Sequence, residues 1–337
     1  MEKELSKKEK LGDKRLEFDK IFDDLKEKYH FEGFFHTTSF ENFVEIMTCK
    51  KIFSRAELQK AGIKFSDIAL DDVIDKTRQP IKNYVRFYFR EKTPTNYDNE
   101  GIKPKSVLEL ETNFKAHSPN PVIMIFDHNI AFDNQNVFFA RGNASRNKTK
   151  FTNKINQLRD FEWEQIFHNQ AIIEENLKDL IINMRNAEIM YPNFISIDKI
   201  VKIIFRNVCD YERAIYLFGK DDRFVVDDKY FFNDWLSVKE SSLIKNNDNL
   251  KLKLCFNLGR NMSKYKLSNF EHKIIIFKGD KIVKKGYVKD IDKRVEYSSF
   301  AYPKIADIEI DLNLKDKCDY ICYFIDNIEC VRISCCD

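Results

Sequence analysis

Short runs rich in apolar, β-branched and aromatic residues recur along this chain, and they restrict its fold more than any other feature. Before residue 233 they stand at 31–40, 83–89, 106–112, 121–127, 197–207 and 223–232. Runs of this length, bounded by polar or turn-forming residues, are typical of β-strands. Helix-like stretches lie between several of them, so the sequence predicts a mixed α+β fold.

The helix-like stretches are recognised by amphipathic spacing and by capping residues. Residues 12–29 carry apolar side chains on one face, and Ser39 can cap a helix that continues to residue 49. Residues 70–80, "LDDVIDKTRQP", read as a helical piece that ends at its proline. The Pro- and Asn-containing segment 92–101 is expected to be a loop.

Beyond residue 233 the chain becomes a series of short strand-like runs separated by polar turns. The sequence therefore predicts three parts: an N-terminal helix at 1–29, a mixed domain at 30–232, and a small β-rich module at 233–337. The first half of the module is basic, with 13 Lys or Arg against 4 Asp or Glu between residues 239 and 289. Local charge of this kind suits an anionic partner.

Composition excludes several classes of protein. The 337 residues have an ordinary balance, with 43% hydrophobic and 33% charged residues and a net charge of +3. No apolar run approaches the roughly 18 residues of a membrane span, and the first residues lack the apolar segment of a secretory signal. We expect a cytoplasmic protein without a membrane partner. No Gly-rich dinucleotide or phosphate loop is present.

Eight cysteines are present, and five of them lie near the end of the chain. The CxxC spacing of zinc sites is absent, so no resident metal is expected. Without an export signal, disulfides are not expected either. Their apolar, strand-like surroundings favour reduced cysteines that pack in a core.

Two groups of side chains suit a polar ligand with an aromatic ring. His36, Thr38 and Asn42 stand at a strand end and in the first turn of the next helix, where they can hydrogen-bond a ligand hydroxyl. Ordinary helix capping beside a half-buried histidine explains them equally well. The strand-and-loop segment 83–97 adds three tyrosines, Tyr84, Tyr88 and Tyr97. These rings can face an aromatic ligand, although core packing is the simpler explanation.

The segment 134–159 is basic and contains no acidic residue. It combines cations with aromatic rings. Proteins that bind single-stranded nucleic acid use cations to contact the phosphates and aromatic rings to stack on the bases. The candidate contacts are Arg141, Arg146, Lys148, Lys150, Lys154 and Phe139. A solvated charged loop is the alternative explanation.

Glu188 is a carboxylate in an apolar setting, since Ile181 and Ile182 precede it and Ile189 and Met190 follow it. A glutamate is almost never buried unless it is paired. A position at an edge strand or at a helix end, pointing to water, is the simple explanation.

These segments, in this order, resemble the DarT-type ADP-ribosyltransferases over residues 30–232. The segments are "HTTSFENFVEIM", "YVRFYFREKTPTNY", "FFARGNASRNKTKF" and "NAEIMYPNFISIDKIVKIIF". The resemblance implies an antiparallel two-sheet core of the ADP-ribosyltransferase type with peripheral helices. The chain beyond residue 232 resembles no family that we can name.

The resemblance also implies roles for individual residues. Glu188 would be the catalytic glutamate, and His36, Thr38 and Asn42, with the three tyrosines, would line the NAD+ pocket. The family uses an arginine before the "YVRFYF" strand; Arg78 is the nearest candidate, although out of register, and Arg86 and Arg90 are rivals. Thr95 stands where the family has methionine, which changes the fine shape of the pocket.

The function implied by the resemblance is transfer of ADP-ribose from NAD+ to a base of single-stranded DNA by a toxin or anti-phage effector. A carboxylate near the reacting sugar can stabilise its developing positive charge. RNA or protein as the acceptor is an alternative, and so is a binding module without activity. A neutralising antitoxin is the expected partner. A metal-dependent nuclease is a weaker alternative, because solvated faces explain the carboxylates of "LDDVID" and "LELET".

Overall fold

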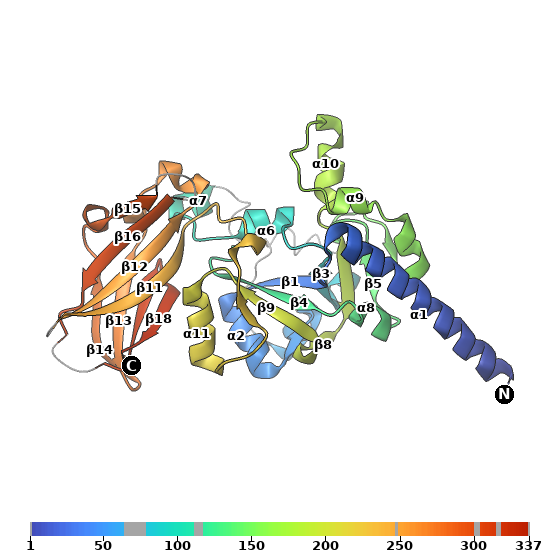
Figure 1. The fold of residues 1–337 in the computed structure, drawn as a ribbon, viewed down its shortest axis with the longest axis horizontal. Helices are drawn as coiled ribbons and strands as arrows, with labels where there is room; N and C mark the ends of the chain where they lie inside the picture. Colours follow the sequence, from blue (N-terminus) through green and yellow to red (C-terminus); the bar gives the residue numbers. More distant parts are fainter. Residues whose placement is uncertain are drawn as a thin grey trace. The chain divides into compact units, whose positions relative to one another are not determined.

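The computed structural model describes this chain as a mixed α and β protein whose last third is made of strands (Figure 1). The residues described are 2–63, 79–110, 117–246, 249–299, 304–314 and 318–335. The α-helices are α1 (Glu2–Tyr29), α2 (Phe40–Cys49), α3 (Arg55–Ala61), α5 (Gln79–Lys82), α6 (Pro94–Asn99), α7 (Lys105–Leu110), α8 (Ile130–Asp133), α9 (Trp163–Ile166), α10 (Glu175–Met184) and α11 (Val208–Phe218).

The strands before residue 233 are short, mostly three to six residues. They are β1 (Phe34–Ser39), β2 (Lys51–Phe53), β3 (Tyr84–Tyr88), β4 (Pro121–Phe126), β5 (Phe138–Ala140), β6 (Phe151–Thr152), β7 (Glu188–Pro192), β8 (Phe194–Ser196), β9 (Ile200–Phe205) and β10 (Phe224–Val226). Short 3-10 turns, such as η2 (Ile155–Asp160), join several of them.

Within the described ranges, eight of these strands form one sheet in the order β10-β9-β4-β1-β3-β7-β5-β6, and β2 pairs with β8. The neighbours from β1 to β6 in this order are antiparallel, whereas β9 and β10 are parallel. The predicted mixed fold with an additional β-rich C-terminal region is confirmed.

By its internal contacts the chain divides into two compact units, each built from several segments. The first unit comprises residues 1–37, 45–96 and 123–202. The second comprises residues 38–44, 97–122 and 203–337. The second unit thus combines pieces of the region before residue 233 with all of the C-terminal strands. The predicted boundaries at residues 29 and 232 stay predictions.

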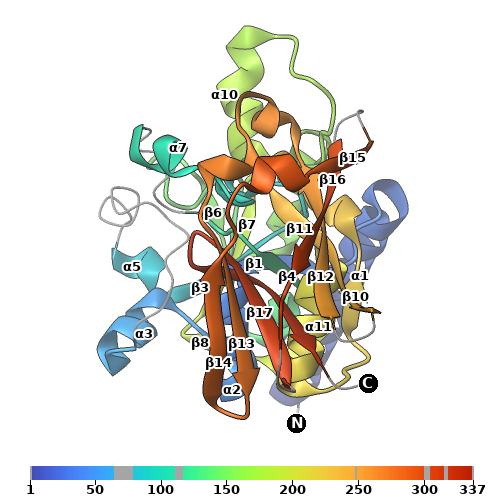
Figure 2. The same ribbon diagram turned by 90° about the vertical axis from the view of Figure 1, so that its left-hand side faces the viewer.

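The C-terminal strands form two four-stranded sheets that face each other (Figures 1 and 2). Their orders are β11-β12-β16-β15 and β14-β13-β17-β18 over the part of the chain that is described. The strands are β11 (Ser237–Asn246), β12 (Asn249–Leu258), β13 (His272–Lys278), β14 (Lys281–Tyr287), β15 (Glu296–Ser299), β16 (Lys304–Asp311), β17 (Tyr320–Ile325) and β18 (Ile328–Ser334).

A buried apolar cluster fills the space between these two sheets. Alternate residues such as Leu252 and Leu254 on β12, and Ile321 on β17, point inward and are fully buried, as the two-residue period of a strand requires. Ile102 and Cys209, which lie outside the C-terminal strands in sequence, belong to the same cluster. The sandwich therefore completes its core with residues from before position 233.

Two short segments fold differently from the sequence expectation. Residues 106–110 of the expected strand at 106–112 lie in helix α7, and part of the expected loop 92–101 forms helix α6. Both helices have a start that holds their first N–H groups: the carbonyl of Pro104, just before α7, accepts hydrogen bonds from Val107 and Leu108, and Thr93 Oγ1 accepts from the Asn96 N–H beside Pro94. Pro in the first turn and a Thr cap are helix-start signals. The helical piece expected at 70–80 lies mostly outside the described residues.

A disulfide links Cys318 and Cys335, which corrects the expectation of reduced cysteines. The two residues flank the antiparallel pair β17–β18, in which Tyr320 faces Ser334. The Cys335 N–H donates to the Asp319 carbonyl at 2.8 Å, so the pairing of the strands brings the two side chains together, with Cα atoms 5.8 Å apart. Among the described helices, none combines the length and apolar character needed to cross a bilayer.

Candidate active site

Three neighbouring strands place one group of side chains on one face of the large sheet. Antiparallel pairing puts Glu188 of β7 opposite Tyr88 of β3 and opposite Ala140 of β5. Arg86 of β3 faces Met190, so Arg86 and Glu188 are diagonal neighbours on the same face. The register of the strands thus joins two residues that are 102 positions apart in sequence.

Glu188 is completely buried, and its carboxylate is held by an arginine. Arg86 Nη2 donates to Oε1 at 2.5 Å, and Arg86 Nε donates to Oε2. The backbone N–H of Ala144 donates a third hydrogen bond to Oε1 at 3.2 Å. The side chain of Arg86 is 28% exposed whereas that of Glu188 is 0% exposed. A two-pronged arginine therefore covers the carboxylate.

The loop between β5 and β6 fixes the other side of Arg86. Asn143 Oδ1 accepts from Nη2 at 3.2 Å, and Ser145 Oγ accepts from Nη1 at 3.1 Å. Gly142 suits this position, because a Cβ here would lie 2.2 Å from the side-chain nitrogen and 3.0 Å from the carbonyl oxygen of Asn183. A larger residue therefore requires the Asn183 side chain to move.

Charge and burial act together on the arginine and tyrosine of this face. Burial of the Arg86 guanidinium favours a lower pKa, but the Glu188 carboxylate outweighs it and raises the pKa. Burial, followed by the same carboxylate, raises the pKa of Tyr88 to about 12. Tyr88 thus keeps its proton over the physiological range and can donate a hydrogen bond. Its side chain also hydrogen-bonds Thr95, which in turn donates to Asn186 Oδ1 at 3.0 Å.

His36 is joined to the ion pair through the backbone. Its Nδ1 lies 3.0 Å from the carbonyl oxygen of Arg86, and its ring lies against Phe87 with centroids 5.6 Å apart. Burial lowers the pKa of His36, so the ring is neutral near pH 7. Nδ1 then carries the proton, which leaves Nε2 as an acceptor.

The other residues expected at the donor pocket lie in two units. Tyr84 belongs to the first unit, where its ring packs edge-on against Phe138 at 5.9 Å. Thr38, Asn42 and Tyr97 belong to the second unit. Thr38 is buried on β1, and Tyr97 is 42% exposed. That these residues line one pocket with His36 stays a prediction.

Of the three candidate arginines, the structure pairs Arg86 with Glu188. Arg78 lies outside the described residues. Arg90 is 5% exposed and donates to the carbonyls of Ile166 and His168 at 2.9 and 2.8 Å. Burial lowers the pKa of Arg90 to about 10. Arg90 therefore holds the chain around α9, away from the carboxylate.

The basic segment divides into exposed and engaged side chains. Arg146, Lys148, Lys150 and Lys154 are exposed. Arg141 instead donates to the Asp160 carbonyl at 2.6 Å and pairs with Glu162 at 3.5 Å. The four exposed cations remain candidates for contacts with phosphate groups, whereas Arg141 holds its own loop.

Phe139 requires a correction. The sequence suggested that its ring stacks on a base, but the side chain is 1% exposed in β5. The residue pairs with Ile189 of β7 and with Thr152 of β6, so the ring lies in the core of the sheet. A ring without an exposed face cannot stack on an incoming base.

Sequence reasoning missed the polar groups that hold the ion pair. The backbone N–H of Ala144 and the side chains of Asn143 and Ser145 carry no recognisable catalytic signature. The Gly-Asn pair at 142–143 was a turn signal inside the basic segment, and it marks the position where the loop bends onto Arg86. Within the described residues, no three His, Cys, Asp or Glu side chains gather as metal ligands.

Comparison with known proteins gives one family. A family model described as DarT, ssDNA thymidine ADP-ribosyltransferase, matches residues 35–232, which is more than half of the chain. A search of curated proteins found no match.

Solved structures of DarT proteins are similar to part of this chain. Thermus sp. 2.9 DarT in complex with ADP-ribosylated ssDNA is 13% identical, with a TM-score of 0.48, and the match covers 59% of this chain and 95% of that one. The same Thermus protein in complex with NAD+ is 13% identical with a TM-score of 0.46, covering 59% and 96%. Thermosipho africanus DarTG in complex with ADP-ribose is 14% identical with a TM-score of 0.45, covering 63% and 53%.

Proposed function

Because this chain belongs to the DarT family of single-stranded-DNA thymidine ADP-ribosyltransferases, we propose that it transfers ADP-ribose from NAD+ with Glu188 as the catalytic carboxylate. NAD+ supplies the ADP-ribose group, with nicotinamide as the leaving group. The observation that carries this assignment is the complete burial of Glu188 between Arg86 and the Ala144 N–H. A carboxylate fixed in a site without water stabilises positive charge on a nearby sugar far better than one in water.

Arg86 is the positioning residue for Glu188. Its guanidinium binds both carboxylate oxygens and covers them. A sugar can reach the carboxylate only when the guanidinium shifts from at least one oxygen. Asn143 and Ser145 hydrogen-bond the same guanidinium, so the loop between β5 and β6 controls that shift.

His36 holds the donor by hydrogen bonding. Its neutral ring donates from Nδ1 to the Arg86 carbonyl, and the opposite nitrogen accepts from a ribose hydroxyl. Thr38, Asn42, Tyr84, Tyr88 and Tyr97 complete the donor site in this proposal. Arg78 is retained as an alternative catalytic arginine, and comparison of Arg78→Ala with Arg86→Ala separates the two assignments.

The acceptor strand is guided by the exposed cations of the basic loop. Arg146, Lys148 and Lys150 stand on the same loop whose Asn143 and Ser145 hold Arg86. A strand whose phosphates bind these cations would lie beside the reacting carboxylate. Its bases are unstacked already, so a single strand costs less to present than a duplex. Affinity should fall steeply with salt concentration.

We further propose that the protein is a toxin-type effector with anti-phage action in the cytoplasm and that a neutralising partner accompanies it. Modified DNA bases are harmful to the cell that makes them, so uncontrolled activity must be masked or reversed. Co-expression with candidate neighbouring genes, scored by rescue of growth, tests it.

The first experiment incubates the purified chain with labelled NAD+ and matched DNA and RNA single strands. We expect label on DNA and a loss of about 100-fold or more in Glu188→Gln, since an electrostatic group at the reacting atoms contributes on this order. Glu27→Gln, an exposed glutamate of α1, is the matched control and should keep full activity. Circular dichroism must show that both variants are folded.

Each result has one meaning. Label on DNA that Glu188→Gln retains in full would remove Glu188 from catalysis. Label confined to RNA or to protein would keep the reaction but change the acceptor. Binding of nucleic acid without any release of nicotinamide would make the chain a binding module and would contradict the proposal.

A further inference from the structure

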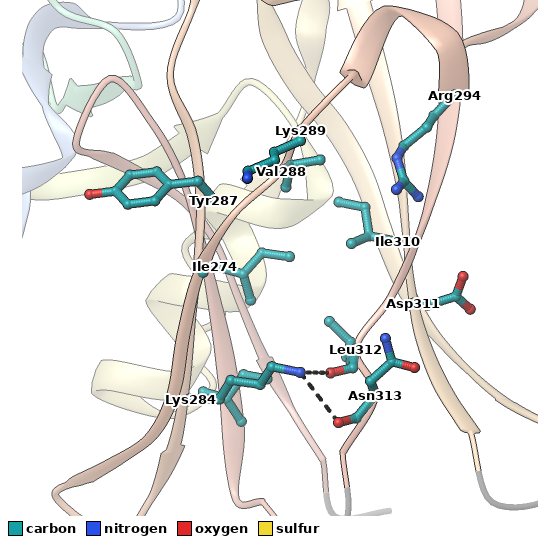
Figure 3. Close-up of a pocket in the computed structure, with 12 residues that line it drawn as sticks. Ile274, Lys284, Tyr287, Val288, Lys289, Arg294, Ile310, Asp311, Leu312 and Asn313 are labelled. Carbon is teal, nitrogen blue, oxygen red and sulfur yellow. Dashed lines mark hydrogen bonds between the residues drawn. The ribbon is translucent and has the colours of Figure 1, made fainter.

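A pocket of about 370 Å³ opens between the two C-terminal sheets, within the second unit (Figure 3). Strands β13 and β14 form one wall, and the end of β16 with the following Leu312 and Asn313 forms the other. Pockets for small molecules span roughly 300 to 1,000 Å³. The volume is therefore sufficient for one nucleotide unit. We call this pocket, lined by residues of 274–294 and 310–313, the sandwich slot.

Strand register explains which side chains enter the slot. Ile274 pairs with Gly286, and Ile276 pairs with Lys284, so these four residues share the face of the β13–β14 pair that lines the slot. A Cβ on Gly286 would meet nothing within 4 Å, so the space above this residue is open. Tyr287 follows on the opposite face, and its ring points away from the slot in Figure 3.

Isoleucine and leucine side chains line part of the slot, polar groups line the rest of it, and a lysine closes one of its ends. Ile274 faces Ile310 and Leu312 across the slot. Lys284 Nζ donates to the carbonyls of Leu312 and Asn313 at 2.6 and 3.3 Å, which ties the two walls together. The side-chain amide of Asn313 remains at the rim and offers both a donor and an acceptor.

Two further cations stand at the rim. Lys289 and Arg294 are exposed, and no ion pair joins either of them to another described residue. The one carboxylate among the lining residues is Asp311, which lies 3.8 Å from Lys251 Nζ. The nearby Asp290 is paired with Lys293 at 3.2 Å. The rim therefore carries a net positive charge toward an incoming ligand.

We propose that the sandwich slot binds a nucleotide of single-stranded DNA, with the base between Ile274 and Ile310 and the backbone phosphates on Lys289 and Arg294. Lysines on an edge strand such as β14 also discourage strand pairing between molecules. That role explains exposed Lys281 and Lys285, but it does not require a slot with a cationic rim. Aliphatic side chains beside cations suit the faces of a base and the phosphate that it carries.

This inference rests on the proposed function for its choice of single-stranded DNA as the ligand. It adds a second DNA-binding site outside residues 35–232, to which the family model is confined. The second site would hold the strand whether or not the reaction proceeds, so binding can be measured in the full chain without NAD+.

The test measures the affinity of the full chain for a labelled DNA single strand as a function of salt. In Lys289→Gln/Arg294→Gln we expect the slope of log affinity against log salt to fall by about 1.4, since each phosphate contact on a single strand contributes about 0.7. Lys220→Gln/Lys264→Gln removes two exposed lysines elsewhere in the second unit and is the matched control. Its slope should not change.

A second pair of variants tests the slot without altering charge. Gly286→Phe fills the open space and should weaken DNA binding about tenfold, because a base that no longer enters the slot loses its buried apolar contacts. Gly286→Ala should bind as the original chain does. Label transfer to a minimal oligonucleotide is measured in parallel, and it should be unaffected by all of these variants.

The outcomes separate the slot from the reaction. Binding that responds equally to the slot variants and to the control pair overturns the inference, and so does a loss confined to RNA. A chain that binds DNA through the slot but transfers no label keeps the inference and loses the proposed function. A chain that transfers label, but whose DNA affinity does not change in the slot variants, keeps the proposed function and loses the inference.

Discussion

Glu188 and Arg86 show at the scale of single residues how a carboxylate can lie at 0% exposure in a sheet. The cost of removing it from water is offset by two bonds from one guanidinium and a third from a backbone N–H. Removal of one partner leaves the other buried without its charge complement. The pair is therefore strongly coupled.

Arg86→Ala should lower the free energy of unfolding by about 3 kcal/mol, which is the order of magnitude for breaking a buried ion pair. The double variant Arg86→Ala/Glu188→Ala should recover part of this loss, because no charge then remains unpaired. Chemical denaturation of the two single variants and the double variant gives the coupling energy. Additive losses would show that Arg86 and Glu188 are not energetically coupled.

The importance of Glu188 could be predicted from sequence, but its partner could not. A buried glutamate needs a cation as its partner, and residue type alone does not say which arginine or lysine supplies it. The choice of Arg86 depends on the register between β3 and β7, which no local pattern determines. The prediction for Phe139 was wrong for the same reason, since a basic segment follows it in sequence, whereas strand pairing places it in the core of the sheet.

His272 gives the C-terminal sandwich a dependence on pH. Its Nε2 lies 2.7 Å from the Leu267 carbonyl and its Nδ1 lies 2.5 Å from the Tyr323 hydroxyl. Burial lowers the pKa of His272, and the neutral ring accepts from Tyr323 while it donates to Leu267. Unfolded histidine takes up a proton near pH 6.5, whereas the folded ring does so only at lower pH.

Stability should therefore be complete above pH 6.5 and should fall as the pH decreases through 6.5 toward the lowered pKa. Thermal melts between pH 8 and pH 5 test this expectation. His36 and His128 also have lowered pKa values, so the informative quantity is the difference between the original chain and His272→Gln. The variant should lose less stability on acidification; an identical loss in both proteins would exclude His272 as a contributor.

At the scale of elements, the loop between β5 and β6 connects the acceptor cations to the ion pair. Gly142 lets this loop pass the end of α10, where the Asn183 side chain accepts from the Asn143 N–H at 3.2 Å. A larger residue must move the Asn183 side chain, which holds the Asn143 N–H. The hydrogen bonds from Asn143 and Ser145 to Arg86 would then lengthen.

Gly142→Ala should reduce the rate of label transfer about tenfold or more, since small displacements of positioning groups are costly. Combined with Asn183→Ala, it relieves the closest contact of the new Cβ but also removes the acceptor of the Asn143 N–H, so the rate recovers only if the steric contact is the main cause of the loss. A steady-state assay compares the single and double variants. Full activity of Gly142→Ala would show that the loop has room to move without disturbing Arg86.

Strands and helices with a clear apolar periodicity were predictable from sequence. Short helices that can be recognised only by their capping residues were not. The alternation in 83–89 and the apolar run of 121–127 gave strands β3 and β4. Helices α6 and α7 were missed because each has six residues, too few to show a helical period. Their Thr-Pro and Pro-Lys starts were the available signals, but residues 92–101 were expected to be a loop and residues 106–112 a strand.

At the scale of the whole molecule, the core of the C-terminal sandwich includes residues from outside it. Ile102 and Cys209 are buried in the cluster between the sheets. Arg213 of α11 pairs with Glu329 of β18 at 3.4 Å and lies over the Phe40 ring at 3.8 Å. A boundary at residue 232 looks natural in the sequence, where the texture changes, but side-chain packing crosses it.

Residues 1–232 alone should therefore fold poorly. Removal of the sandwich would expose apolar side chains such as Ile102 and would leave Arg213 without Glu329. We expect a broad thermal transition and increased binding of a hydrophobic dye relative to the full chain. A sharp transition and unchanged activity in the shortened chain would show that residues 233–337 are an independent domain.

The shared core has a consequence for inheritance. A module whose core includes side chains from outside it cannot be transferred alone to another protein. A division at residue 232 would leave both parts with incompletely packed cores. Recombination would succeed only if the donors on either side of the cut already matched at Ile102, Cys209 and Arg213. Sequence change in this lineage should thus couple positions before and after residue 233, and the sandwich should be gained or lost together with them.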